Sequence, residues 1–212
     1  MNYLAHMFLS DDTPLSMLGN FMGDFVKGNV EGKFEQEIVD GILHHRRVDH
    51  FTDSHAIVSS SKKLISQARC RFSGIIIDVL YDHFLSRNWS LYSKTRLDDF
   101  IERVYKKLHN HWRGIPPAAE LCIEKMLKED WLSSYGSPEG IDKTFKRISE
   151  RLRRENNLCS AVEELENNYH VLNTHFLRFF PLLINHLGPD QSNLLSGGTK
   201  KSCSSREIES PD

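Results

Sequence analysis

The fold is decided by residues 72–89, which read FSGIIIDVLYDHFLSRNW. The runs Ile75–Ile77 and Val79–Leu80 make a helix over this stretch apolar on nearly every side, so we expect it to be buried among other helices. Through most of the remaining chain, apolar residues recur at three- and four-residue spacing, and clean alternation is hard to find. The sequence therefore predicts an all-α protein, a single-domain helical bundle.

The other helices follow from the same spacing and from residues that begin or end helices. Thr13-Pro14 marks a helix start, because proline at the first helical position loses only an N–H that has no partner there. Apolar spacing, bounded by Gly, Pro, Ser or Asn, predicts further helices over residues 34–52, 56–69, 97–112, 117–134, 141–154 and 161–186.

The length of 212 residues favours one domain with a tail. From residue 189 to residue 212 the chain changes to mostly small and polar residues, which bury too little apolar surface to offset the entropy lost on ordering. We therefore expect a helical domain over residues 1–188 and a flexible C-terminal tail over residues 189–212.

Charge and cysteine usage limit the kinds of partner and compartment. The chain carries 27 basic and 29 acidic residues, a net charge of −2, so nucleic-acid binding by counterion release is not expected. No apolar run approaches the roughly 18 residues of a membrane span, and the N-terminus lacks a signal-peptide pattern. The four cysteines are scattered without a C-x-x-C pair, which favours a reducing, cytoplasmic compartment.

The densest polar cluster lies within residues 41–55. On a helix His45, Asp49 and Asp53 are each four residues apart, so their side chains share one face and can converge on a single cation. The alternative is an exposed helix in which Arg46 or Arg47 forms ion pairs with these acids.

Two further aspartates, Asp78 and Asp82, lie one turn apart inside the most apolar stretch. An uncompensated carboxylate there would cost several kcal/mol, so a positive group must lie beside them. That group is either an arginine of the preceding cluster, as a structural ion pair, or a divalent metal shared with His45 and Asp49.

Two weaker candidates lie near the N-terminus. Asp24 is flanked by apolar side chains, with glycines nearby that allow close backbone approach, and this suits a ligand better than a solvated acid. His6 lies in the apolar stretch Leu4–Leu9, where a lone histidine is more often a hydrogen-bonded core residue than a ligand.

The donor set limits the chemistry. Imidazoles and carboxylates without thiolates suit Mn²⁺, Mg²⁺, Fe²⁺ or Zn²⁺, and manganese is our first choice. The chain has no Gly-rich phosphate loop, no G-x-S-x-G elbow and no H-E-x-x-H pair, which argues against nucleotide kinases, serine hydrolases and zincins. Metal-assisted hydrolysis remains.

Several motifs together resemble a known family. They are Met1–His6, Leu18–Asn20, Gly23–Gly28, His45–Asp49, Phe51–Asp53, Asp78–Val79, Asp82–Leu85 and Trp89. Over residues 1–187 the chain resembles the acyl carrier protein phosphodiesterase family, also called acyl carrier protein hydrolyase. The resemblance implies hydrolytic removal of the 4′-phosphopantetheine arm from holo-acyl carrier protein, manganese dependence and a helical fold related to the HD phosphohydrolases. The doublet here is Asp82-His83, the reverse of the HD order, so we assign ligands by geometry as well as by likeness.

Combined with this reaction, the candidate residues take specific roles as a hypothesis. The metal ion would be held by Asp24, His45, Asp49 and Asp82, with His6 and Asn20 as additional candidates. Water activated by the metal would attack the phosphorus, and Arg46 or Arg47 would stabilise charge there. His83 or Asp53 would transfer the proton, and Asp78 would orient a ligating histidine.

An acidic carrier protein requires a locally basic docking surface. Two basic runs qualify: Lys143, Lys146, Arg147, Arg151, Arg153 and Arg154 on one helix and its end, and Arg103, Lys106 and Lys107 on another. We expect Arg47, Arg147 and Arg151 to contact the substrate or partner, the alternative being a solvated helix face. Two other functions stay open: an HD-like hydrolase of a nucleotide or another small phosphate ester, and a non-catalytic helical adaptor that binds an acidic protein.

Overall fold

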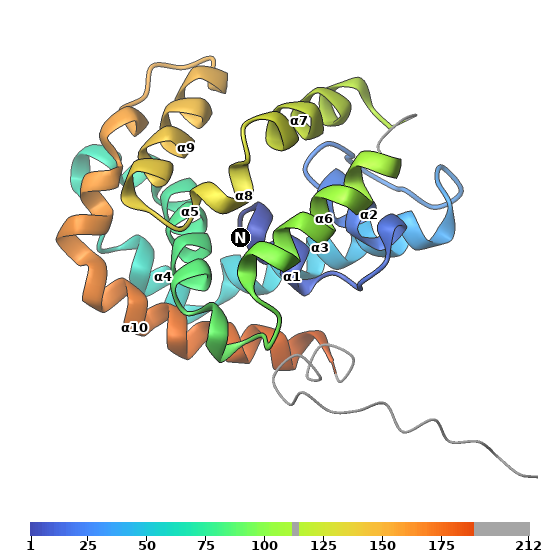
Figure 1. The fold of residues 1–212 in the computed structure, drawn as a ribbon. Helices are drawn as coiled ribbons and strands as arrows, with labels where there is room; N and C mark the ends of the chain where they lie inside the picture. Colours follow the sequence, from blue (N-terminus) through green and yellow to red (C-terminus); the bar gives the residue numbers. More distant parts are fainter. Residues whose placement is uncertain (112–114, 189–212) are drawn as a thin grey trace, which may run out of the picture.

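The computed structural model describes residues 1–111 and 115–188, and these form ten α-helices and three short 3-10 helices without a β-strand (Figure 1). The α-helices are α1 (Tyr3–Leu9), α2 (Pro14–Met22), α3 (Gln36–Ser54), α4 (Ala56–Lys62), α5 (Ser73–Arg87), α6 (Leu97–His111), α7 (Pro117–Lys128), α8 (Trp131–Ser134), α9 (Pro138–Arg151) and α10 (Val162–Leu187). The 3-10 helices are η1 (Gln67–Phe72), η2 (Trp89–Leu91) and η3 (Leu158–Ser160). The prediction of an all-α protein is confirmed, and the predicted tail, residues 189–212, lies outside the described residues.

Helix α5 lies in the apolar core, as its sequence predicts. Leu80, Tyr81 and Phe84 have no exposed surface, and the helix contacts α1, α4, α9 and α10 (Figure 1). Phe176 and Phe179 of α10 pack their rings against Tyr81. Because α5 is enclosed in this way, polar side chains on it must find their partners inside the molecule.

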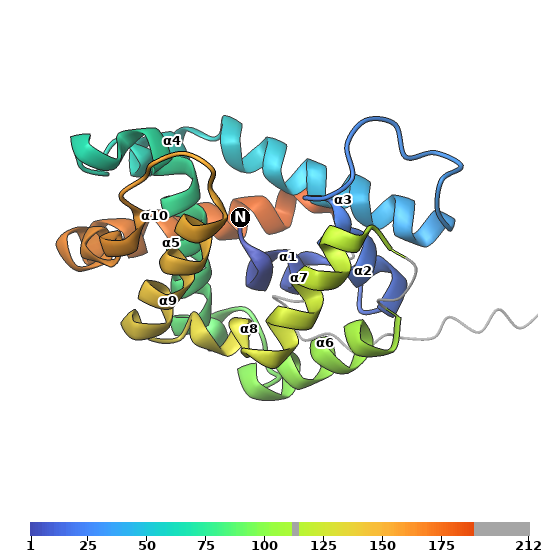
Figure 2. The ribbon, with the colours of Figure 1, turned by 90° about the horizontal axis from the view of Figure 1, so that it is seen from above.

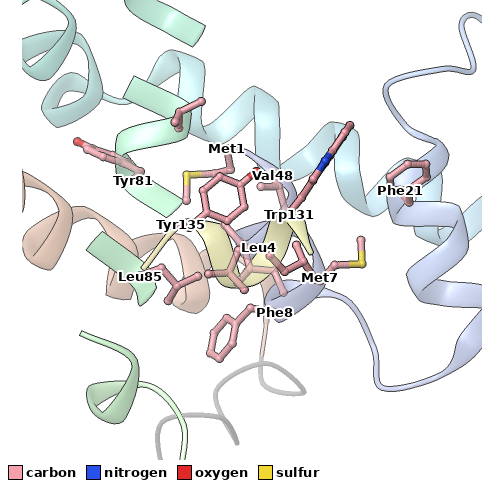
Figure 3. Packing of buried hydrophobic residues seen from close by; sticks show 14 of the residues in the cluster. Met1, Leu4, Met7, Phe8, Phe21, Val48, Tyr81, Leu85, Trp131 and Tyr135 are labelled. Atoms are coloured by element: carbon pink, nitrogen blue, oxygen red, sulfur yellow. The ribbon is translucent and has the colours of Figure 1, made fainter. Parts of the chain in front are cut away.

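The N-terminal helix α1 lies near the middle of the molecule in both views (Figure 1, Figure 2). Six of its seven residues are buried. Leu4, Met7 and Phe8 lie in the apolar cluster together with Leu85 and Tyr135 (Figure 3). Two turns are too short for apolar periodicity to predict such a helix, and its stability comes from this packing.

Helices α2 and α3 cross at backbone contact distance because two glycines meet there. A Cβ atom at Gly19 would lie 2.3 Å from the carbonyl oxygen of Ile38, and one at Gly41 would lie 2.5 Å from that of Ser16. A larger residue at either position would push the helices apart. The crossing brings Asn20 and the turn after α2 onto α3, where the candidate site lies.

The helix predicted over residues 56–69 ends at Lys62, because contacts with α10 replace its last turns. The backbone N–H of Ser66 donates to the carboxylate of Glu164 at 3.2 Å, and the Arg69 guanidinium lies 3.0 Å from the same carboxylate. The segment continues as η1. A pattern read along one helix cannot include these partners from the far end of the chain.

The helix predicted over residues 117–134 is broken at Asp130, which has a left-handed backbone with φ of 48°. The Asp130 carboxylate accepts a hydrogen bond from the Tyr105 hydroxyl at 2.9 Å, which holds the break in place. The helix predicted over residues 141–154 is α9, which begins earlier and ends earlier. Within the described ranges no helix combines the length and the hydropathy of a membrane span.

Candidate active site

Side chains from α1 and α3 converge on one carboxylate. His6 and His45 both direct Nε2 at Asp49, at 3.1 Å from its Oδ1 and 3.0 Å from its Oδ2 respectively. One donor atom from each of the three residues lies within 4.8 Å of the others. Two imidazole nitrogens and a carboxylate oxygen at this spacing form a set that one divalent metal ion can bind.

The ring of His6 is fixed by two neighbours. It stacks on His45 with the ring centroids 4.0 Å apart and 14° between the planes. Its Nδ1 lies 3.0 Å from Oδ1 of Asn20 and its Nε2 lies 3.1 Å from Oδ1 of Asp49. When Nε2 binds a metal ion, Nδ1 carries the proton and can donate it to the amide oxygen, which only accepts hydrogen bonds.

Electrostatics favour positive charge at this point. Burial, reinforced by His45, lowers the pKa of His6 to about 4, so this ring is neutral near pH 7. Burial also acts to lower the pKa of His45, but hydrogen bonds to Asp24 and Asp49 outweigh it and raise that pKa to about 9. The contacts with His45 and His6 hold the pKa of Asp49 well below its usual range, although burial opposes them. The buried Nδ1 of His45 has no hydrogen-bond partner among the described residues. These residues fit a divalent metal ion.

Asp24, one of the predicted ligands, lies at the edge of this group. Its Oδ1 is 3.6 Å from Nε2 of His45, and its side chain is 54% exposed. Arg46 fixes the segment that follows by donating to the carbonyl oxygens of Val26 and Gly28, at 3.0 Å and 2.9 Å. The structure thus places Arg46, predicted to stabilise charge on phosphorus, against the loop that carries Asp24.

Asp82, also predicted as a ligand, holds the start of α1. Its oxygens accept hydrogen bonds from the backbone N–H groups of Asn2, Leu4 and Ala5, at 3.3 Å, 2.7 Å and 3.3 Å. Burial raises the pKa of Asp82 to about 7, although the amino group of Met1 and these backbone donors oppose the shift. In this arrangement Asp82 positions α1, and with it His6, and does not itself join the group around Asp49.

The positive group beside Asp78 is the amino group of Met1. Its nitrogen lies 3.0 Å from Oδ1 of Asp78 and 3.5 Å from Oδ1 of Asp49. Although burial acts to lower it, the two carboxylates raise the pKa of this amino group to about 11. Arg47 contacts Nδ1 of His44 at 3.2 Å instead. The alternative of a structural ion pair between Arg46 or Arg47 and these aspartates is not found among the described residues, and the amino group of Met1 lies beside Asp78 instead.

The two predicted proton carriers lie outside the group around Asp49. Nδ1 of His83 lies 2.8 Å from the backbone carbonyl oxygen of Tyr135, and the ring is buried. Asp53 is 72% exposed and forms an ion pair with Lys62 at 2.8 Å. Of the predicted triplet at four-residue spacing on α3, the structure brings together His45 and Asp49.

A cavity of about 580 Å³ adjoins the group. Asp24 and Asp78 line it, together with Arg147 and Arg151 of α9. The guanidinium of Arg147 lies 4.3 Å from the ring centroid of Trp131, which also lines the cavity. Both arginines, predicted to contact the substrate or partner, therefore face the same space as Asp24.

Much of the predicted basic docking surface is neutralised by neighbouring acids. On α9, Lys146 lies 2.6 Å from Asp142. On α6, Arg103 and Lys107 both pair with Asp12, at 3.3 Å and 2.7 Å. The run on α6 therefore offers little free positive charge to an acidic partner.

Asn20 contacts His6, and if the group around Asp49 holds a divalent metal ion, replacement of Asn20 by alanine is expected to weaken its binding by about tenfold to a hundredfold. Asn20→Ala removes the hydrogen-bond acceptor beside Nδ1 of His6. The ring proton can then move to Nε2, and a protonated Nε2 cannot bind a metal ion. Isothermal titration with Mn²⁺ measures the change. An affinity equal to that of the wild type would show that the amide does not set the tautomer.

His6 and Asn20 were only additional candidates from the sequence, although each is a polar residue inside an apolar run.

Comparison with known proteins identifies the family. A family model described as acyl carrier protein phosphodiesterase matches residues 1–183. Relatives named acyl carrier protein phosphodiesterase occur in Photorhabdus laumondii (33% identical), Serratia proteamaculans (34%) and Yersinia enterocolitica (35%). Each match covers 87% of this chain and 93%, 96% and 96% of the respective relative. No solved structure matches the chain, so the relation to HD phosphohydrolases stays a prediction. The chain belongs to the acyl carrier protein phosphodiesterase family.

Proposed function

We propose that this protein hydrolyses the phosphodiester that links 4′-phosphopantetheine to the serine of holo-acyl carrier protein, releasing the apo form. Family membership supports the reaction. The structural observation that carries it is the group His6, His45 and Asp49, a set of metal-binding donors that adjoins a cavity lined by two arginines. A phosphodiester anion needs positive charge near its oxygens, and this arrangement can provide it.

The metal would be held by His6, His45 and Asp49, with Asp24 as a further ligand on the cavity side. Manganese is the proposed ion, since nitrogen and oxygen donors without thiolate suit it. A divalent metal bound there supplies Lewis acidity toward a phosphoryl oxygen and toward water. Asp24 is the most exposed of these side chains and lines the cavity, so it is the ligand that an entering substrate meets first.

The remaining residues position this group. Asn20 fixes the ring of His6, Asp82 fixes the start of α1, and Arg46 fixes the loop after Asp24. In the reaction water forms a bond to phosphorus and gives up one proton, and the bond from phosphorus to the serine oxygen breaks. The serine oxygen takes up one proton as it leaves, so 4′-phosphopantetheine and the serine hydroxyl are the products. Since His83 and Asp53 have partners of their own outside the group, we assign both proton transfers to solvent in the cavity.

Intact-mass analysis of holo-acyl carrier protein after incubation with this protein and Mn²⁺ tests the proposal. Loss of the prosthetic-group mass, prevented by chelator and restored by Mn²⁺, is the expected result. An unchanged mass under all conditions would reject the proposal and favour the helical adaptor. Hydrolysis of free phosphodiesters or nucleotides at comparable efficiency would favour a hydrolase of small phosphate esters. Since the proposed substrate is a cytoplasmic carrier, we place the reaction in the cytoplasm.

Manganese affinity is expected to rise with pH by about tenfold per unit, because the metal competes with one proton. The pKa of His45 is about 9, so this ring is protonated below that pH and must lose its proton to bind the metal. His6, with a pKa of about 4, is already neutral and adds no further dependence. Titration with Mn²⁺ between about pH 6 and pH 8 measures the slope. A flat profile would contradict the assignment of His45 as a ligand.

A further inference from the structure

The cavity beside the metal-binding group is larger than the reacting phosphate requires. Its lining combines residues near the start of the chain and on α5 with one face of α9, called the α9 wall here. Thr144, Arg147, Ile148 and Arg151 lie three or four residues apart on α9, so they share this face. Space of about 580 Å³ lined by two arginines and by apolar side chains suits a ligand that joins an anion to an uncharged chain.

The two arginines of this wall differ in how they are held. Arg147 donates to the Thr144 hydroxyl at 2.7 Å, lies 3.6 Å from the Glu129 carboxylate and stacks on Trp131. Its side chain is only 20% exposed, so its charge is already compensated within the wall. It shapes the cavity and fixes the indole ring.

Arg151, one turn further along α9, has the side chain of Tyr3 as its partner. It lines the cavity, and within residues 1–111 and 115–188 it forms no ion pair with a carboxylate. Tyr3 raises the pKa of Arg151 although partial burial opposes the shift, so the guanidinium stays charged. Asp24, on the same cavity, is matched by His45 at 3.6 Å. A guanidinium that forms no ion pair with a carboxylate, on the cavity that Asp24 also lines, is a site for an anion.

Apolar and aromatic side chains also line the cavity. They include Ile75 and Val79 of α5, Ile148 and Leu152, and Trp131. Such surfaces bind methyl and methylene groups and leave amide groups of a ligand in contact with water at the cavity mouth. The pantetheine chain, with its geminal methyl groups and methylenes, has this chemistry.

We propose that this cavity receives the 4′-phosphopantetheine arm of the carrier, with Arg151 binding the phosphate and the Ile148 face of α9 contacting the pantetheine chain. The inference rests on the proposed function, since it takes the substrate from there. It assigns Arg151 to the substrate arm inside the cavity and not to the surface of the carrier protein.

Calorimetric binding of two small ligands, 4′-phosphopantetheine and pantetheine, tests the assignment. Chelator is present throughout, so that no metal contributes to phosphate binding. We expect wild-type protein to bind 4′-phosphopantetheine more tightly than pantetheine. Arg151→Met should lower the affinity for 4′-phosphopantetheine by about tenfold to a hundredfold and leave the affinity for pantetheine unchanged, because only 4′-phosphopantetheine carries a phosphate. Arg151→Lys should recover part of the loss.

Two further variants separate the chain from the phosphate. Ile148→Trp fills the cavity with a larger side chain and should lower the affinity for both ligands. Arg96→Met is the matched control, because Arg96 is an exposed arginine that pairs with Asp98 and does not line the cavity. This variant should bind both ligands with the affinity of the wild type. The inference is overturned if wild-type protein binds neither ligand, or if Arg151→Met binds both ligands as the wild type does. Arg151 is exposed, so its variant keeps the test valid even if Ile148→Trp does not fold.

The experiments distinguish a failure of this inference about the cavity from a failure of the proposed hydrolysis. If holo-acyl carrier protein loses its prosthetic group while Arg151→Met binds 4′-phosphopantetheine normally, the proposed function stands and this inference fails. If the mass of the carrier stays unchanged while binding depends on Arg151, the cavity binds the arm and the proposed hydrolysis fails.

Discussion

Asp49→Asn is expected to reduce turnover of holo-acyl carrier protein by at least about a thousandfold and to abolish manganese binding. Asp49 is the one residue that contacts both histidines, with Oδ1 at 3.1 Å from His6 and Oδ2 at 3.0 Å from His45. An asparagine has the same shape but lacks the negative charge, and its amide nitrogen is a donor that cannot bind a metal in place of an oxygen. Intact-mass kinetics and metal analysis of the purified variant measure both effects.

Asp40→Asn is the matched control for this variant. Asp40 lies on the same helix, is exposed and accepts a hydrogen bond from Gln36 at 2.9 Å. The same change of charge there should leave turnover and metal content at the wild-type level. If Asp49→Asn retained full metal content, the carboxylate would not be a ligand, and the group would be a structural network around His45.

The parts of the site that lie within one helix could be predicted from the sequence. His45 and Asp49 are four residues apart on α3, and helical periodicity alone places them together. The burial of α5 also followed from its composition, because an apolar helix has only one stable environment. Such inferences need no knowledge of how helices cross.

The parts that depend on packing between helices could not be predicted. His6 reaches Asp49 only because α1 is buried near the middle of the molecule, and Asp82 holds it there through backbone N–H groups that no sequence pattern reveals. The positive partner of Asp78 is the amino group of Met1, 77 residues away along the chain. From the sequence alone, the expected partner was either a nearby arginine or a divalent metal shared with His45 and Asp49. The number of charges on α9 likewise could not show that Arg147 and Arg151 line a cavity, because a cavity forms only where several helices pack together.

Gly23→Ala is expected to lower manganese affinity and turnover by about a hundredfold or more, because it displaces a ligand without removing one. A Cβ atom at Gly23 would lie 2.2 Å from Cγ of His45, 2.4 Å from its Cδ2 and 2.7 Å from its Cβ. The backbone of Gly23 is right-handed helical, with φ of −52° and ψ of −35°, so alanine causes no strain in the backbone itself. The steric clash is therefore with the side chain of His45.

That ring has little freedom to respond, since it stacks on His6 at 4.0 Å and contacts Asp49 at 3.0 Å. Any shift that relieves the clash therefore breaks the donor set, and overpacking of this kind costs about 1–3 kcal/mol of folding free energy.

Gly74→Ala is the matched control, because its nearest neighbour is Cε of Lys62 at 3.9 Å. Alanine in that helical position should leave manganese binding unchanged and stabilise the fold by up to about 1 kcal/mol. Thermal unfolding and Mn²⁺ titration of both variants separate the two effects. A Gly23→Ala protein that is destabilised but binds Mn²⁺ as the wild type does would mean that His45 is not a ligand, since the ring cannot keep its place once the methyl group is present.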